Sequence, residues 1–191
     1  KCFYKKYVEK NELDIFKKEK RPAELITGIL PKIKKQSIKA EALYIQGKDQ
    51  YYNTETSYLD AIKTFSLLSK RYKTFKHNED TLFYLGRSYY YTKIPLYEKA
   101  LAIFVKLINK NQRSANLAEY YFWCGECYYE MNQIDKALES FSKALMSKPN
   151  RSLECDIYYN LGWLYAGLGK IESAKAAFSK LMEKDLIDYS Q

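Results

Sequence analysis

The sequence of 191 residues has few of the residues on which catalytic and metal sites depend. It contains one histidine and four cysteines. Cys124 and Cys127 are the only pair with the spacing of a redox or zinc motif, and no second pair follows. Phosphate-binding glycine loops and serine elbows are absent. The sequence therefore argues against an enzyme, and it predicts no catalytic residue, no cofactor and no metal ligand.

Glycine and proline are also scarce, with seven and four residues. These numbers exclude a collagen-like or linker-rich chain. No apolar run approaches the roughly 18 residues that cross a bilayer as a helix. Hydrophobic residues make up 47% of the chain and charged residues 29%. This balance is typical of a chain that folds around an apolar core.

The positive charge is concentrated near the beginning of the sequence. The formal net charge is +9. Residues 1–39 contain 12 Lys and Arg against 5 Asp and Glu, or +7, which leaves 20 against 18, or +2, for residues 40–191. Nucleic-acid-binding domains more often spread basic residues over the folded surface with aromatic residues between them. The distribution therefore disfavours nucleic acid as a partner.

Residues 118–151 contain a pattern of small and bulky residues that predicts two packed helices. Gly125 and Ala137 let the two helices approach each other, and Tyr128 and Phe141 fill the space beside them. Pro149 is expected to end the second helix, because proline lacks the amide hydrogen and its ring does not fit inside a helical turn. Such a helix pair cannot bury its apolar faces alone, so neighbouring pairs must stack on it.

The same pattern occurs four times. Its glycines are Gly47, Gly86, Gly125 and Gly162, which are 39, 39 and 37 residues apart. The alanines of the second helices are Ala61, Ala100, Ala137 and Ala174, which are 39, 37 and 37 residues apart. The first copy is degenerate, because Gln46 and Gln50 stand where the pattern has Leu and Tyr. We therefore expect a repeat domain over residues 37–191, with helix pairs at about 40–74, 79–112, 118–151 and 155–188.

Residues 40–186 resemble the tetratricopeptide repeat (TPR) family, an all-α fold in which helix pairs form an α-solenoid. The irregular, long repeats are most like those of bacterial cell-envelope members. The resemblance implies a non-enzymatic scaffold for protein–protein interaction. It also implies that the first helix of each pair lines a partner-binding groove, formed here by Tyr44, Lys48, Tyr51, Phe83, Arg87, Tyr90, Phe122, Glu126, Tyr129, Tyr159 and Trp163.

Aromatic residues occupy four equivalent positions of this groove: Tyr44, Phe83, Phe122 and Tyr159. TPR modules that hold a chaperone's C-terminal carboxylate have basic residues and asparagine there, so that function is not expected. Aromatic side chains bury a large area at low entropic cost, which favours an apolar or helical segment of a partner protein. The alternative is that part of the aromatic stripe belongs to the core.

Residues 1–36 are expected to form a basic helix-loop-helix arm without the repeat signature. One interpretation is a cap on the first repeat. The other is a contact surface for an anionic membrane or an acidic partner, formed by Lys5, Lys6, Lys17, Lys18 and Lys20. Because the sequence starts with Lys1 rather than Met, we also expect an upstream segment, which could be an anchor.

These features together predict a membrane-anchored adaptor of the bacterial envelope, with its repeats in the periplasm, that binds and stabilises another envelope protein. A cytosolic adaptor or co-chaperone is the alternative, followed by an RNA-associated factor that uses the basic arm. Cys124 and Cys127 lie inside a predicted helix, away from a helix N-terminus. We expect them to be buried structural cysteines.

Overall fold

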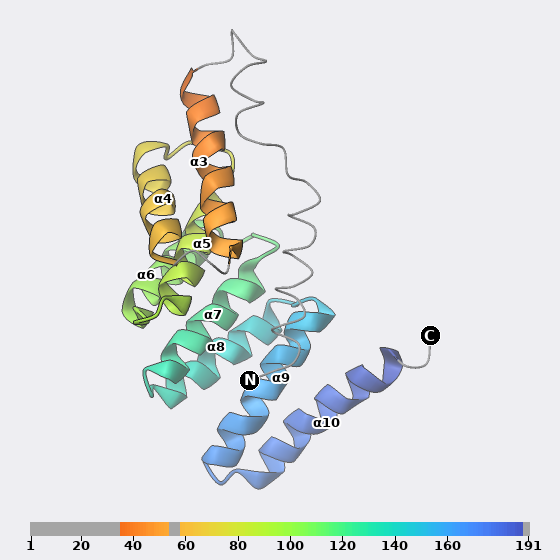
Figure 1. Ribbon diagram of the computed structural model, residues 1–191. Coiled ribbons are helices and arrows are strands. Elements are labelled where there is room, and N and C mark those ends of the chain that lie inside the picture. Colours follow the sequence, from red (N-terminus) through yellow and green to blue (C-terminus); the bar gives the residue numbers. More distant parts are fainter. Residues whose placement is uncertain (1–34, 54–57, 189–191) are drawn as a thin grey trace. The chain divides into compact units, whose positions relative to one another are not determined.

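The computed structural model describes residues 35–53 and 58–188, with side chains placed over 37–53 and 58–183. These residues form eight α-helices and no strand, in the order α3 (Lys35–Tyr52), α4 (Tyr58–Arg71), α5 (Asn78–Tyr91), α6 (Tyr97–Lys110), α7 (Leu117–Glu130), α8 (Ile134–Met146), α9 (Arg151–Gly167) and α10 (Ile171–Asp188) (Figure 1). The predicted all-α fold is confirmed, and the helix pairs overlap the four predicted repeats.

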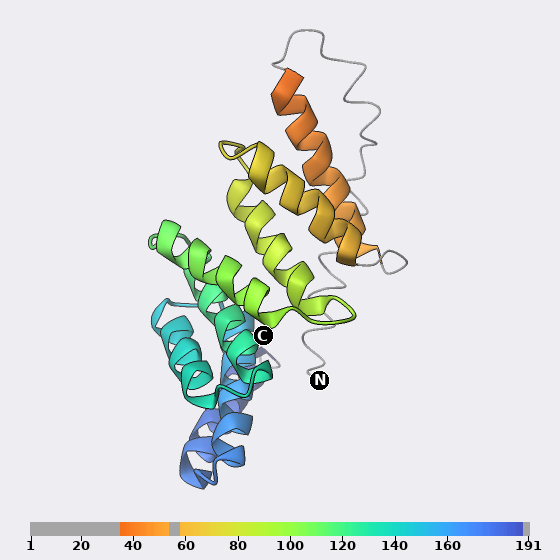
Figure 2. The same cartoon turned by 90° about the vertical axis from the view of Figure 1, so that its left-hand side faces the viewer.

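The chain divides into two compact units, with the boundary inside α6 between Ile103 and Phe104. In the first unit α3 pairs with α4, and α5 packs against both of them (Figure 2). In the second unit α7 pairs with α8 and α9 with α10, and α8 also contacts α9. The two helix pairs of the second unit therefore stack on each other, and in the first unit α5 stacks on the pair formed by α3 and α4.

The glycines of the repeat pattern mark the closest approach within a pair. A Cβ atom added to Gly125 would lie 2.6 Å from Cε1 of Phe141. Added Cβ atoms at Gly47 and Gly162 would lie 2.5 Å from the rings of Phe65 and Phe178. A phenylalanine of the second helix thus fills the space that a side chain would take on the first helix. The predicted role of the glycines is confirmed in these three pairs.

The degenerate first repeat replaces part of the apolar pattern with a polar contact. Gln50 on α3 accepts a hydrogen bond of 2.7 Å from the hydroxyl of Thr64 on α4. Thr64 is buried, so this bond satisfies a hydroxyl that would be costly to bury alone. Gln46 is exposed. The first repeat therefore tolerates Gln50 because it pairs with the buried Thr64, and Gln46 because it faces solvent.

The turns inside the third and fourth pairs share one backbone conformation. Asn132 has a φ of 58° and Gly169 a φ of 70°, and each lies two residues beyond the end of its helix. Glycine and asparagine tolerate this left-handed region best. Helix α8 ends at Met146, before Pro149, and Lys148 has a φ of 56°. Pro149 disfavours a helical conformation at the preceding residue, which accounts for the early end.

None of the helices in the described part of the chain is both long enough and apolar enough to cross a membrane.

Candidate partner-binding surface

In the first unit, α3 and α5 bring predicted groove residues together around a lysine. Nζ of Lys48 lies 5.7 Å from the ring centroid of Tyr44 and 5.4 Å from that of Tyr84. Both distances are those of cation–π contacts. Tyr84 follows Phe83 directly and was not predicted as part of the site, because the repeat pattern marks only the positions that face the expected groove.

A second cation lies between the same helices. Cζ of Arg87 on α5 is 5.3 Å from the ring centroid of Tyr51 on α3 and 5.6 Å from that of Phe83. Arg87 and Tyr51 are each only 6% exposed. Cation–π contacts gain strength when they are desolvated. Arg87 therefore ties α3 to α5, so it has a structural role whether or not it also contacts a partner.

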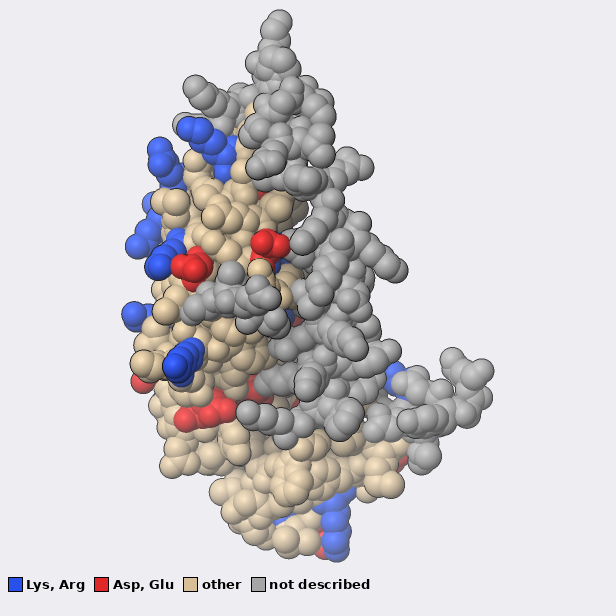
Figure 3. Space-filling model, in the orientation of Figure 1, with Lys and Arg blue, Asp and Glu red and all other residues tan. Residues whose placement is uncertain are grey.

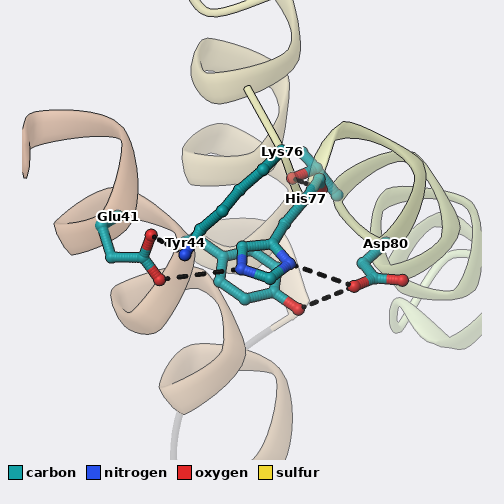
Figure 4. A network of polar contacts seen from close by, with 6 residues as sticks. Glu41, Tyr44, Lys76, His77 and Asp80 are labelled. Atoms are coloured by element: carbon teal, nitrogen blue, oxygen red, sulfur yellow. Dashed lines mark hydrogen bonds and ion pairs between the residues drawn. The ribbon is translucent and has the colours of Figure 1, made fainter. Parts of the chain in front are cut away.

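A network of polar contacts fixes the beginning of α5 against α3 (Figure 4). The imidazole of His77 stacks on the ring of Tyr44 at 4.7 Å, with Nε2 3.8 Å from Glu41 and Nδ1 3.6 Å from Asp80. The Tyr44 hydroxyl donates a 3.3 Å hydrogen bond to Asp80, and Lys76 forms a 3.2 Å ion pair with Glu41. Tyr44 is thus held in one orientation.

Burial, followed by the negative charge of Asp80, raises the pKa of Tyr44 above its ordinary value. The hydroxyl therefore stays protonated and keeps its role as a hydrogen-bond donor.

We expect Tyr44→Phe to lower the free energy of unfolding by about 1 kcal/mol, because it leaves Asp80 without this donor. Urea unfolding measures the change. Tyr121→Phe is the matched control, because the Tyr121 hydroxyl makes no hydrogen bond in the described structure, and its change should stay within about 0.5 kcal/mol. Equal changes for the two variants would show that the bond to Asp80 adds no stability.

In the second unit, two of the predicted groove residues are buried. Phe122 is 5% exposed and lies against Trp123 and Phe141, with ring centroids 5.5 Å and 5.8 Å away. Glu126 is 7% exposed and accepts a hydrogen bond from the side-chain amide of Asn160, which links α7 to α9. Phe122 therefore belongs to the core, as the alternative interpretation of the aromatic stripe expects.

Two other aromatic residues of the same helices face solvent. Tyr129 on α7 is 50% exposed and Trp163 on α9 is 58% exposed. The Trp163 ring makes edge contacts with Phe178, at 5.7 Å, and with Tyr159, at 6.3 Å. These contacts restrict a large ring that remains accessible. A restricted aromatic ring loses little entropy on binding, which is what an interface anchor requires.

The eleven predicted groove residues thus differ in accessibility. Tyr129 and Trp163 are exposed, and four are half-buried: Tyr44, Lys48, Phe83 and Tyr159. Five are buried: Tyr51, Arg87, Tyr90, Phe122 and Glu126. Helix α3 contacts α4 and α5, and α7 contacts α8 and is linked to α9 through Glu126, so part of the surface of these first helices faces the core. As partner contacts, all eleven remain predictions. The arm residues Lys5, Lys6, Lys17, Lys18 and Lys20 lie outside the described residues.

Cys124, Cys127 and Cys155 form no disulfide and are buried, and burial is the prediction made for Cys124 and Cys127. Cys124 is 3% exposed, Cys127 0% and Cys155 5%. Burial raises the pKa of the Cys124 thiol to about 12, although Lys143 acts in the opposite direction. A neutral thiol is a poor nucleophile and a poor metal ligand. In the described part of the chain, no group of three His, Cys, Asp or Glu residues could hold a metal ion.

We expect the Cys124 thiol to make stability depend on alkaline pH. The unfolded thiol ionises above a pKa near 9.0, whereas the folded thiol keeps its proton to about 12. Between these two pH values the folded state binds more protons than the unfolded state. The contribution of the thiol to the free energy of unfolding therefore falls as pH rises, by up to about 1.4 kcal/mol per pH unit. Urea unfolding of the wild type and Cys124→Ala should give a stability difference that shrinks above pH 9. A difference that is constant with pH would contradict the burial effect.

Family models of the tetratricopeptide repeat match residues 118–151 and 156–183. These segments coincide with the third and fourth helix pairs. A search of the curated proteins gave no match to this sequence.

Several solved structures share the fold. A structure of MamA is 21% identical, with a TM-score of 0.69, over 100% of this chain and 99% of that one. MamA 41-end from Desulfovibrio magneticus RS-1 is 22% identical, with a TM-score of 0.64, over 76% of this chain and 75% of that one. BtubC (BKLC) from P. vanneervenii is 18% identical, with a TM-score of 0.62, over 98% of this chain and 75% of that one.

Proposed function

Because this chain is a tetratricopeptide repeat protein, we propose that it is a non-enzymatic scaffold that binds another protein through the first helices of its repeats. The observation that carries this proposal is the exposure of Tyr129 and Trp163 on α7 and α9. Large aromatic side chains that are ordered and yet accessible are typical anchors of protein interfaces.

The chemistry of these anchors selects an apolar or helical segment as the bound element. Neither anchor carries a charge, and the buried Glu126, which precedes Tyr129 on α7 by three residues, is engaged with Asn160. A carboxylate-terminated peptide would find no basic partner among these residues. An amphipathic helix could instead place apolar side chains against the indole and phenol rings.

The first unit offers a contact region of different character. Tyr44, Lys48 and Phe83 are half-buried there, and the polar network around His77 holds Tyr44 in place. We propose these residues as secondary contacts, because their exposed edges combine aromatic area with one positive charge. A partner segment with an acidic residue among apolar ones would match this combination.

We further propose that the partner is an envelope protein and that the chain acts as a membrane-anchored adaptor in the periplasm, where it stabilises this partner. The support is the resemblance of its long, irregular repeats to those of envelope TPR proteins, together with the basic arm, which would favour an anionic bilayer. Protease treatment of spheroplasts from the native host tests the location. Degradation of the repeats in intact spheroplasts supports the proposal, whereas protection until lysis supports the cytosolic adaptor.

The binding surface itself is tested by capturing partners on wild-type protein and on a Tyr129→Ala, Trp163→Ala double variant, with identification by mass spectrometry. A protein retained by the wild type and lost from the variant supports the proposal. Retention by both would place the contact elsewhere. Sensitivity of capture to ribonuclease would favour the RNA-associated alternative instead.

A further inference from the structure

A hollow of about 760 Å³ lies between the first turns of α3 and the connection from α4 to α5. Its lining is formed by Ser37, Ala40 and every residue from Lys70 to Lys76. The volume falls in the range of sites that hold a small molecule or a short peptide segment. We call this site the basic hollow. It shares no residue with the predicted groove.

The basic hollow carries four positively charged side chains: Lys70, Arg71, Lys73 and Lys76. Lys76 is paired with Glu41 at 3.2 Å. Lys70, Arg71 and Lys73 make no ion pair in the described part of the chain. Lys and Arg side chains gather on the surface over the end of α4 and the connection that follows it (Figure 3). The lining therefore has an excess of positive charge that the described residues leave uncompensated.

The wall of the basic hollow is held by backbone hydrogen bonds and by ring contacts of Phe75, and among the described residues only one of its charged side chains, Lys76, takes part, through Glu41. The backbone amide of Tyr72 donates a 2.9 Å hydrogen bond to the carbonyl of Leu68, and the backbone amide of Phe75 donates a 3.0 Å hydrogen bond to the carbonyl of Tyr72. The Phe75 ring packs against Tyr44 and His77, with centroids 5.9 Å and 5.4 Å away. Because the wall does not depend on Lys70, Arg71 and Lys73, these three side chains remain available for a ligand.

A helix C-terminus attracts basic residues through its dipole, and this accounts for Lys70 and Arg71, which end α4. It does not account for Lys73 and Lys76, which lie beyond the helix in the connection to α5. Lys76 is held by its ion pair with Glu41, whereas neither the helix dipole nor an ion pair with a described residue accounts for Lys73 on the same hollow.

We propose that the basic hollow binds a short acidic segment of a partner protein. The preceding residues 1–36, with 11 basic against 5 acidic residues, have the wrong charge to fill it. Nucleic acid is disfavoured because single strands stack on several aromatic side chains, whereas Phe75 already packs on Tyr44 and His77 and leaves Tyr72 as the other aromatic residue of the lining. A carboxylate-rich segment would be held by Lys70, Arg71 and Lys73, and it would compete with Glu41 for Lys76.

This site goes beyond the proposed function, because it would bind without the exposed aromatic residues of α7 and α9. The two contacts can therefore be tested separately. Trp163→Ala should leave the affinity for an acidic peptide unchanged, whatever it does to the capture of a partner.

The probe is a fluorescein-labelled hexaglutamate peptide, with hexaglutamine as its neutral counterpart, measured by anisotropy at low and at physiological salt. We expect the wild type to bind only hexaglutamate and to bind it more weakly as salt rises. Lys70→Glu with Lys73→Glu should weaken binding by about tenfold or more, and Glu41→Gln should strengthen it about twofold by releasing Lys76.

The matched control is Lys106→Glu with Lys110→Glu on α6, which makes the same change in net charge on exposed residues outside the hollow. Circular dichroism and thermal unfolding establish that each variant is folded. No binding of hexaglutamate by the wild type, or an equal loss in both double variants, would overturn the proposal. Tighter binding of a single-stranded oligouridine that is lost in the hollow variant would overturn it in favour of nucleic acid.

Discussion

Gly125→Leu is expected to destabilise the fold strongly, whereas Gly167→Leu should leave it unchanged or stabilise it. A Cβ at Gly125 would lie 2.6 Å from Phe141, and the Phe141 ring is 1% exposed, so it has little room to move. Overpacking of this kind costs about 1–3 kcal/mol and occasionally more. The larger Leu side chain should reach the upper end, which for a chain of this size lowers the melting temperature by about 6–12 °C.

Gly167 is the matched control because it is also helical, it closes α9, and no atom lies within 4 Å of an added Cβ. Replacing glycine in a helix gains up to about 1 kcal/mol when space is available. A second control is Gly125→Ala combined with Phe141→Leu, in which the smaller side chain makes room for the added methyl group. The combined effect should be less than the sum of the two single effects. Similar melting temperatures for Gly125→Leu and Gly167→Leu would contradict the helix packing described above.

The Tyr129→Ala, Trp163→Ala double variant is expected to lose most of its affinity for the partner protein while keeping its fold. Interface anchors of this type contribute about 2 kcal/mol or more, so the dissociation constant should rise by roughly 30-fold or more. Isothermal titration with the captured partner measures the change. The helices should persist, because both side chains are at least half exposed.

Met146→Ala with Met182→Ala is the control for a general loss of exposed apolar surface. Met146 is 82% exposed on α8 and Met182 is 63% exposed on α10, so both lie on second helices of their pairs. Trp163→Phe should retain most of the affinity by keeping a ring against Phe178. A larger effect from the methionine pair than from the aromatic pair would place the binding surface on the second helices.

The helix pairs could be predicted from the sequence because small residues at helix contacts have few alternatives. Gly47, Gly125 and Gly162 each face a phenylalanine ring at a distance that excludes a side chain. Because only glycine fits at these positions, the glycines recur at a regular spacing that can be read from the sequence. Even the degenerate first repeat keeps Gly47, although it changes the residues around it.

The accessibility of the candidate site could not be predicted in the same way. Tyr, Phe and Trp fill cores and interfaces equally well, so their spacing does not separate Phe122, which is 5% exposed, from Trp163, which is 58% exposed. The difference depends on the neighbouring helices. Phe122 is covered by Phe141 and Trp123, whereas the contacts of Trp163 with Phe178 and Tyr159 leave more than half of it exposed.

Interactions between residues distant in the sequence were also beyond prediction. His77 is the only histidine, and nothing in the sequence placed its imidazole on Tyr44, 33 positions earlier. The basic hollow is similar, because Lys70 to Lys76 form part of a site only when α3 is placed beside them. A signal was nevertheless present, since four of the seven residues from Lys70 to Lys76 are basic, across the end of α4 and the connection that follows it.

Site-specific photo-crosslinking tests the central claim, that the first helices of the repeats bind the partner, most directly. A benzophenone amino acid would replace Trp163 on α9 or, in a separate variant, Met146 on α8, both of which are exposed. Irradiation in the native host, followed by mass spectrometry, identifies what each position contacts. If the first helices bind the partner, one protein is crosslinked at position 163 and absent at position 146. The same protein crosslinked at position 146 and absent at 163 would contradict this claim.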